Sequence, residues 1–374
     1  MRILTFAAYY YPHIGGYIKN IHELSKRLVE KGYSVTIVTC NTDSADAVEV
    51  MDGVKVIRLP VWDIPDRAVS VPKPSLSLFR LCFTKSDYDV VLTQARIFTM
   101  SLLGAVYAKV HRIPLIHVER GGCHGTGNGR IATQLLKVYD HTIGSWLVRS
   151  ADRRVGISQA ACDLIEHVGG KNARVIYNGM DVNDKTQLGR ILDGTTVIIY
   201  VGRLIYAKGV QDLLEAFNLC CNQYNNLMLW IVGNGNYKDK LKAQASRSPY
   251  SNCIKFCGQL DYRTVMGTLA IADIFVNPSY SEGLPTSVLE AASVGLPIVA
   301  TDIGGTREII DDDISGLLVE PRDVEQLALK ITALASDKNY AKRLGEEAKT
   351  TVIKKFNWDR ITGQWEEILK EVAN

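Results

Sequence analysis

The stretch ADIFVNPSYSEGLPTSVLEAASVGLPIVATDIGG, residues 272–305, contains in order the elements that decide the fold. Two runs rich in apolar and β-branched residues, ADIFVNPS and PIVATD, flank a segment with a helical pattern. Pro285 fits the first turn of a helix, Gly295 fits the position after its last turn, and Pro297 prevents its continuation. These signals predict a helix over about residues 285–294, so that strand, helix and strand form the repeating unit of a parallel sheet.

The same alternation of strand and helix runs along the whole chain and restarts once. The strand-like runs are RILTFAA, SVTIVTC, KVIRLPV, YDVVLTQA, PLIHVE, RRVGIS and RVIYN before the polar segment 181–195, and TVIIYVGR, LMLWIVG, CIKFCG, ADIFVNPS, PIVATD and GLLVE after it. A chain of 374 residues is also too long for one ordinary core. We therefore predict an α/β protein with two Rossmann-like parallel-sheet domains facing a central cleft, residues 1–185 and 186–356. A last helix, residues 357–374, is expected to pack back on the first domain.

The composition predicts a soluble globular protein. It is 47% hydrophobic and 22% charged, and no window approaches the 18 consecutive apolar residues that indicate a membrane span. The opening MRILTFAAYYYPH has one Arg and ends in Pro12 and His13 without a small-residue cleavage site, so we interpret it as a first strand rather than a signal peptide. We expect a cytoplasmic protein.

The eight cysteines fit this compartment, because they lie mainly inside apolar runs and are interpreted as buried thiols. Two groups of possible metal ligands, Cys123 with His124 and Cys253 with Cys257, lack further ligands at the spacing of a zinc site. The sequence therefore predicts no metal site.

The charge is unevenly distributed. Residues 1–190 contain 24 Lys and Arg against 17 Asp and Glu, or +7, whereas the remainder contains 19 against 23, or −4, for a sum of +3. A basic first half suits an anionic partner or an acidic membrane surface, and an ordinary solvated face is the alternative. With the apolar and basic segment LFRLCFTK (78–85), it suggests an acceptor on a lipid phosphate carrier at the inner membrane face.

Ligands of open parallel sheets lie at the carboxyl ends of the strands, so the residues that follow each strand are the candidates. After the first strand, YYYPHIGGYIKN places Gly15 and Gly16 before a helix that begins near Tyr17. Paired glycines let backbone N–H groups approach a phosphate, and the helix dipole adds to the attraction. A tight strand-to-helix turn is the alternative.

The second candidate is YVGRLIYAKG, residues 200–209, in which a strand ends at Gly202 and is followed by Arg203 and Lys208. Two cations at the end of a strand suit a diphosphate, since Arg offers a planar fork and Lys a compact charge. Exposed, solvated side chains are the alternative.

The third candidate is a pair of carboxylates around the predicted helix of residues 285–294. Glu282 and Gly283 lie at its start, beside backbone N–H groups that attract phosphate oxygens. Glu290 lies about five residues into an otherwise apolar helix, roughly 7.5 Å along its axis, where a carboxylate needs partners. Two vicinal hydroxyls, such as those of a ribose, would satisfy it. The alternatives are an internal Arg for Glu290 and an exposed loop for Glu282.

The fourth candidate is PLIHVERGG, in which His117, Glu119 and Arg120 follow a strand and precede a loop rich in Gly and Asn, residues 121–129. Such a loop permits mobility or a backbone nest for an anion. A structural histidine is the alternative for His117.

With these motifs, nearly the whole chain resembles the retaining GT-B glycosyltransferases of glycosyltransferase family 4. The resemblance rests on YPHIGG, GRLIYAKG, VGNG (232–235), FCG (256–258), NPSYSEGLPTSVLEAASVGLP, VATDIGGTREI and SGLLVEP. Glu282 and Glu290 occupy the two positions of the E-x₇-E signature of that family. One departure is the Val-Glu-Arg-Gly-Gly segment after His117, where many members have a small or acidic residue, and we expect acceptor choice to depend on residues 118–130.

The resemblance implies a transferase that uses a nucleotide sugar and needs no metal or other cofactor. His117, Glu282, Arg203 and Lys208 would be catalytic. The implied donor-binding residues are Gly15, Gly16, Arg203, Lys208, Gly233, Asn234, Phe256, Gly258, Glu282, Gly283, Leu284, Pro285, Thr286 and Glu290. The acceptor side would comprise His13, Tyr17, Glu119 and Arg120. A UDP-sugar is favoured over a GDP-sugar, and the acceptor would be a saccharide or lipid-linked hydroxyl in the assembly of a cell-surface polysaccharide, glycolipid or glycan, with no nucleic acid as partner.

The chemistry also constrains the mechanism. Charge builds on the departing diphosphate, which Arg203, Lys208 and the helix start would stabilise. The Asp-x-Asp pairs at 87–89 and 311–313 are interpreted as structural, and no carboxylate nucleophile is evident, which favours attack from the face that the phosphate leaves.

A nucleotide-sugar epimerase of the same architecture is the alternative function. An oxidoreductase would need a G-x-G-x-x-G turn that no strand leads into, and a glycosidase would have no use for the two cations.

Overall fold

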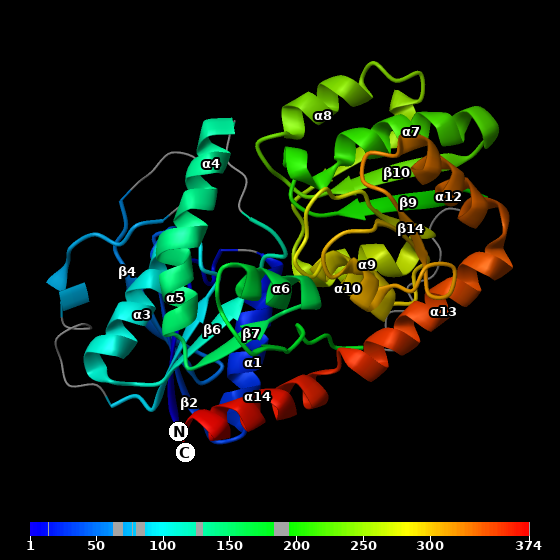
Figure 1. Ribbon diagram of the computed structural model, residues 1–374. Helices are drawn as coiled ribbons and strands as arrows, with labels where there is room; N and C mark the ends of the chain where they lie inside the picture. The colour runs from blue at the N-terminus through cyan, green and yellow to red at the C-terminus, as the bar shows by residue number, and fades with distance from the viewer. Residues whose placement is uncertain are drawn as a thin grey trace. The chain divides into compact units, whose positions relative to one another are not determined.

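The computed structural model describes residues 1–13, 15–62, 70–76, 78–79, 87–124, 130–182 and 194–373. The chain forms two compact units (Figure 1). Unit 1 contains Met1–Gly179 and Trp358–Asn374, and unit 2 contains Met180–Asn357. The predicted boundary at residues 185 and 186 lies outside the described residues, and the second predicted boundary differs by one residue.

Unit 1 is built on an eight-stranded sheet with the order β3-β4-β2-β1-β5-β6-β7-β8. All neighbouring strands are parallel except β3 and β4, which form an antiparallel edge. The strands are β1 (Arg2–Phe6), β2 (Ser34–Cys40), β3 (Val48–Met51), β4 (Val54–Leu59), β5 (Val90–Gln94), β6 (Leu115–Glu119), β7 (Arg153–Gly156) and β8 (Ala173–Val175). β5 is buried along its whole length, as expected of a parallel strand with helices on both faces.

Helices of unit 1 whose bounds lie within the described residues are α1 (Gly16–Glu30), α3 (Thr99–His111), α4 (Arg130–Tyr139), the π-helix η1 (Asp140–Gly144), α5 (Ser145–Ser150), α6 (Gln159–His167) and α14 (Trp358–Ala373). α1 turns a buried stripe of Ile18, Ile21, Leu24 and Leu28 inward, at the spacing of an amphipathic helix.

The last helix, α14, packs on α1. The Arg27 guanidinium lies 4.5 Å from the centroid of the Trp358 ring, and the Lys31 ammonium donates to Glu366 at 2.7 Å. Gly179 leaves room for the same indole, since a Cβ there would approach it to 2.3 Å. These contacts place the C-terminal helix in unit 1 although unit 2 precedes it in sequence.

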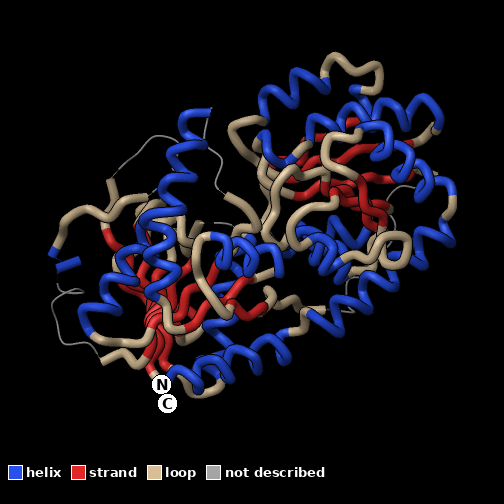
Figure 2. Tube along the Cα trace, viewed as in Figure 1, coloured by secondary structure: helices blue, strands red, loops and turns tan. Residues whose placement is uncertain are grey.

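Unit 2 is built on a fully parallel six-stranded sheet with the order β11-β10-β9-β12-β13-β14. Figure 2 draws the strands of both units in red. The strands are β9 (Thr196–Val201), β10 (Leu227–Val232), β11 (Ile254–Gly258), β12 (Ile274–Asn277), β13 (Ile298–Thr301) and β14 (Leu317–Val319). The helical segments are η2 (Tyr206–Lys208), α7 (Val210–Gln223), α8 (Lys238–Ala245), η3 (Ser251–Cys253), α9 (Tyr262–Ile271), α10 (Thr286–Ser293), α11 (Thr306–Ile309), α12 (Val324–Ser336) and α13 (Lys338–Lys355). The prediction of two parallel-sheet domains is confirmed.

The helix predicted over about residues 285–294 is α10, Thr286–Ser293, and it differs by one residue at each end. Pro285 is its N-cap, and Gly295 adopts a left-handed φ of +76° just beyond its C-cap. Local Pro and Gly chemistry is therefore sufficient to set these bounds.

The cysteines partly match the prediction of buried thiols. Cys40, Cys162, Cys220 and Cys221 are buried, Cys253 and Cys257 are partly exposed, and Cys123 is exposed. Cys82 lies outside the described residues, as does most of the segment 78–85. Within the part of the chain that the structure describes, no helix combines the length and the apolar character needed to cross a membrane.

Candidate functional site

The sheet of unit 2 reverses its direction of growth between β9 and β12. The chain first adds β10 and β11 on one side of β9 and then returns to place β12 on the other side. In open α/β sheets this switch point is where ligands bind. The loops after β9 and β12 contain Arg203, Lys208 and Glu282, so the topology gathers three predicted site residues at one edge.

Lys208 and Glu282 form a direct ion pair across this switch point. The Lys208 Nζ donates to Glu282 Oε1 at 2.6 Å, and the two side chains are only 17% and 12% exposed. Such a charge-assisted bond at a largely buried position fixes both groups. The alternative of Glu282 as an exposed loop residue is therefore wrong.

The loop after β12 is held by hydroxyl groups that the sequence did not single out. The Ser279 hydroxyl lies 2.7 Å from Glu282 Oε1 and 2.6 Å from Asn277 Oδ1, and it has one proton to donate. If it donates to Glu282, the amide of Asn277 is oriented with its NH₂ toward Ser279. The Thr301 hydroxyl of β13 donates to the Ser279 carbonyl at 2.6 Å and ties the loop to the next strand.

Glycines let the backbones of these loops touch. Gly209 has φ +65°, and a Cβ there would lie 1.9 Å from the Pro278 carbonyl oxygen. Gly233 has φ +140°, and its Cβ would lie 1.8 Å from the Gly202 oxygen. The close approach of backbones accounts for both glycines, so their presence alone is no evidence of a phosphate.

Glu290 lies on α10, at the fifth position of the helix, and is 8% exposed. The segment before the helix is braced by a hydrogen bond from the Gly305 N–H to the Gly283 oxygen at 2.7 Å. Thr306, at the start of α11, is fully buried, and its hydroxyl has no hydrogen-bond partner among the described residues. Sequence reasoning missed Thr306, because its burial depends on the fold of the preceding loop.

The remaining predicted donor residues are spread over the same edge. The Arg203 side chain is exposed, while its carbonyl accepts from the Tyr200 hydroxyl at 3.0 Å. The Gly233 N–H donates to the Gly258 oxygen at 2.7 Å, and the Asn234 oxygen accepts from the Leu204 N–H at 2.9 Å. Phe256 packs against the core of unit 2, Leu284 and Pro285 are buried, and Thr286 is partly exposed.

In unit 1 the corresponding switch point lies between β1 and β5. Gly15 is the N-cap of α1 and Gly16 its first residue. The Tyr17 hydroxyl donates to the Tyr9 oxygen at 3.0 Å and accepts from the Tyr9 N–H at 2.9 Å, and Tyr9 stacks on His13 with ring centroids 5.0 Å apart. Burial raises the pKa of Tyr17, so its hydroxyl keeps its proton. The predicted acceptor residues at the start of α1 are thus held in place.

His117 is placed differently from the prediction. It lies inside β6 rather than after it, and its ring has no exposed surface. Its Nδ1 pairs with the Thr93 hydroxyl at 3.0 Å, whereas its Nε2 lies 3.6 Å from Glu119 Oε2 and has no hydrogen-bond partner in the described part of the chain. A role beside a transferred sugar stays a prediction.

Glu119 belongs to a buried network that sequence reasoning missed. Arg96 pairs with Glu119 Oε2 at 2.9 Å and with Asp140 through two bonds of 2.9 and 2.8 Å, and these three side chains are at most 4% exposed. Burial alone would raise the pKa of Glu119, but Arg96, with help from His117 and the Gly121 N–H, holds the pKa well below its ordinary value. Arg96 follows the end of β5, which is the signal that could have found it.

Arg120 is half-buried, and its guanidinium donates to neutral side chains. Its guanidinium donates to Gln94 Oε1 at 2.8 Å and to Asn178 Oδ1 at 3.2 Å, and lies 5.6 Å from the centroid of the Tyr17 ring. Burial lowers the pKa of Arg120 to about 10, so the group stays charged at neutral pH. Arg120 and Tyr17, both predicted on the acceptor side, are therefore neighbours.

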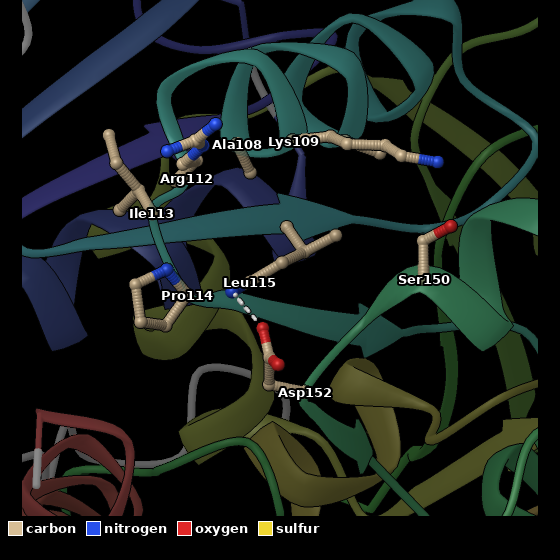
Figure 3. Close-up of a pocket in the computed structure, with 9 residues that line it drawn as sticks. Ala108, Lys109, Arg112, Ile113, Pro114, Leu115, Ser150 and Asp152 are labelled. Atoms are coloured by element: carbon tan, nitrogen blue, oxygen red, sulfur yellow. Dashed lines mark hydrogen bonds between the residues drawn. The ribbon is translucent and has the colours of Figure 1, made fainter.

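A surface pocket of about 380 Å³ lies in unit 1 beside the amino end of β6 (Figure 3). The end of α3, the turn of Arg112–Pro114, the beginning of β6 and the end of α5 line it, and Asp152 accepts from the Leu115 N–H at 2.8 Å. It lies at the amino end of β6, whereas the predicted site residues of unit 1 lie at the carboxyl ends of the strands. We assign it no role in the site.

Family models match both halves of the chain. Residues 14–184 match "Glycosyltransferase Family 4", and residues 183–351 match "Glycosyl transferases group 1". An uncharacterised glycosyltransferase of Methanocaldococcus jannaschii is 30% identical over 100% of this chain and 99% of its own length. The glycogen synthase of Mycobacterium tuberculosis is 29% identical over 96% of this chain and 92% of its own length.

Solved structures share the fold. The crystal structure of Anabaena HepE in complex with UDP and glucose superposes with a TM-score of 0.81 at 19% identity, over 99% of this chain and all of that one. Together with these relatives, the two parallel sheets define a GT-B glycosyltransferase. The chain belongs to glycosyltransferase family 4, with a second half of the group 1 type, and the predicted family and enzyme class are confirmed.

Proposed function

We propose that this glycosyltransferase moves a sugar from a nucleotide diphosphate sugar, with UDP as the favoured nucleotide, to a hydroxyl group of a saccharide or lipid-linked acceptor, with retention of configuration. The observation that carries the proposal is the Lys208–Glu282 ion pair at the switch point of unit 2. A cation and a carboxylate held 2.6 Å apart at the carboxyl ends of the strands would suit a diphosphate and the sugar attached to it.

The pair would change partners when the donor binds. The Lys208 ammonium would turn to the diphosphate, and the exposed Arg203 would add a planar fork to it. Glu282 would then accept hydrogen bonds from sugar hydroxyls, while Ser279 keeps the carboxylate oriented. Because these charges are already in place before the reaction, they can stabilise the negative charge that builds on the departing diphosphate.

Glu290 would bind the ribose. Its carboxylate is largely buried in α10, where vicinal hydroxyls would donate one hydrogen bond to each oxygen. A uridine diphosphate is favoured because HepE, which shares the fold, has been solved with UDP and glucose. The donor chemistry needs no metal in this proposal, since Lys208, Arg203 and the start of α10 supply the positive potential.

Binding of nucleotides tests the donor site directly. The full-length chain should be stabilised against heat by UDP more than by GDP, ADP or NAD, and a ligand at 100 times its Kd adds about 2.7 kcal/mol. Glu290→Ala should abolish the stabilisation by UDP, whereas Glu325→Ala, which changes a glutamate in the first turn of α12, should retain it. Stabilisation by NAD alone, or by none of these compounds, would refute the proposed donor site.

Product analysis tests the reaction. With a UDP-sugar and acceptor, NMR of the anomeric proton should show the configuration of the donor retained, and inversion would exclude attack from the leaving-group face. Conversion of the donor sugar to its epimer without any acceptor would instead identify the epimerase alternative.

A further inference from the structure

Three histidines from separate segments of unit 1 come together in space. His124 follows β6, His141 is the second residue of η1, and His167 is the last residue of α6. The ring centroids lie 5.3 Å apart for His124 and His141, 5.2 Å for His124 and His167, and 5.3 Å for His141 and His167. One ring nitrogen of each histidine lies within 4.8 Å of a nitrogen from each of the others.

One of these rings is oriented by a buried carboxylate. His124 Nδ1 lies 2.7 Å from Asp140 Oδ2, and Asp140 is 2% exposed. Asp140 is in turn fixed by its two bonds to Arg96. A carboxylate that accepts a hydrogen bond from one ring nitrogen of a histidine sets the tautomer and leaves the other nitrogen free to bind a metal. Histidines that bind metals commonly have such a carboxylate partner.

The local backbone supports this arrangement. Asp140 and His141 are adjacent in η1, one turn of π-helix between α4 and α5, and such turns are frequent at functional sites. Asp140 turns into the protein toward Arg96, while His141 is exposed. One short segment therefore provides both a ligand and the carboxylate that orients a second ligand.

We propose that His124, His141 and His167 bind one divalent cation of the zinc class, with water at the fourth position. Three imidazoles and one open position form a ligand set that suits Zn²⁺, whereas Mg²⁺ and Ca²⁺ prefer oxygen ligands. Zn–N bonds of about 2.0–2.1 Å in a tetrahedron require nitrogens about 3.3 Å apart. Since His141 and His167 are exposed, rotation of their side chains can close the present spacing.

The histidine site shares no residue with the proposed donor site. All three histidines, Asp140 and Arg96 belong to unit 1, and none is among the residues proposed to bind the donor. A bound cation would join the segment after β6, η1 and the end of α6. Arg96 also pairs with Glu119 at the end of β6, so the cation would stabilise the part of unit 1 that holds the predicted acceptor residues.

Metal titration of the untagged full chain tests the inference. After removal of metal by a chelator, Zn²⁺ should bind with a stoichiometry of one, measured by competition with a chromophoric indicator, and should raise the melting temperature. Co²⁺ should give the intense visible bands of a tetrahedral site with nitrogen ligands. His141→Ala and His167→Ala, both at exposed positions, should each weaken Zn²⁺ binding by more than about tenfold, because a ligand to the metal is lost.

His111→Ala is the matched control, since it removes a histidine of the same unit at the end of α3. It should bind Zn²⁺ like the unaltered chain. Circular dichroism and the melting temperature without metal establish that each variant is folded. The inference is overturned if the unaltered chain binds no zinc at micromolar concentration, or if the His141→Ala, His167→Ala double variant binds it with unchanged affinity.

Discussion

At the scale of single residues, Lys208 and Glu282 hold each other in a fixed arrangement when no ligand is present. Each is largely buried and each satisfies the other, so the charges are held at low exposure without a substrate. On binding, the donor diphosphate would replace Glu282 as the partner of Lys208. The charge of Lys208 would thus exchange one ionic partner for another of similar strength.

Lys208→Ala should therefore lower kcat by about 10²–10³-fold, the usual effect of losing one preorganised group that stabilises the departing charge. KM for the donor should change less. Lys242→Ala removes an exposed lysine of α8 and should leave both constants unchanged. Steady-state kinetics would measure kcat and KM for the two variants. A rise in KM at constant kcat in Lys208→Ala would show that Lys208 contributes only to binding.

The carboxylate of Glu119 makes the stability of the protein depend on pH. The folded pKa of this carboxylate lies below the ordinary value of 4.5, so Glu119 contributes stability that is fully present above pH 4.5 and is lost as the pH falls toward the folded pKa. Glu119→Gln should cost about 3–5 kcal/mol at pH 7, because it removes one partner of the buried Arg96.

Urea unfolding at several pH values measures this contribution. The difference between the Glu119→Gln variant and the unaltered chain should shrink as the pH falls from 4.5. A difference that stays constant down to pH 3 would contradict the role of the Arg96 charge. Glu347→Gln, at an exposed position of α13, serves as the control.

At the scale of elements, Gly and Pro set where helices and strands end, and contacts between loops decide how closely the elements approach. α10 begins after Pro285 and is followed by Gly295 with positive φ, and both features are local. Gly209 is different, because it combines a positive φ with a backbone contact to Pro278, which belongs to the loop after β12 and is distant in sequence.

Gly209→Ala should destabilise unit 2 by several kcal/mol, since the new Cβ would overlap the Pro278 carbonyl, which cannot move without the β12 loop. Gly363→Ala is the matched substitution in open space within α14 and should stabilise the chain by about 0.5–1 kcal/mol. Chemical denaturation would measure both. Equal effects of the two substitutions would mean that the backbone contact at Gly209 is of no energetic importance.

At the scale of the whole molecule, the first 190 residues have a charge of +7 and the remainder −4. We propose that the basic half attracts anionic membrane surfaces that present a lipid-linked acceptor. Sedimentation with vesicles should show binding to anionic lipid at low salt, little binding to neutral vesicles, and loss of binding at high salt. Absence of binding to anionic vesicles at low salt would overturn this proposal.

The fold was predictable to a large extent, because alternating apolar strands and amphipathic helices are local patterns. The positions of Arg203, Lys208 and Glu282 in the loops after β9 and β12 were also predictable, since topology places strand ends together once the sheet is assumed, and the roles of these residues stay predictions. His117 was misplaced, because the run PLIHVE does not reveal at which residue the strand ends. Asp140 was missed because it stands in no recognisable motif and lies 44 residues from Arg96, whereas Arg96 follows β5 and could have been named from that position.

The sequence by itself determined the alternation of strands and helices except β3, the position of α10 to within one residue at each end, and the family. These properties depend on neighbouring residues and on short motifs. Only the tertiary structure decided that Lys208 meets Glu282, that Arg96 joins Glu119 to Asp140, and that three histidines share one place. The physical reason is that such contacts depend on which strands lie side by side in the folded sheet, and no spacing along the chain encodes that order.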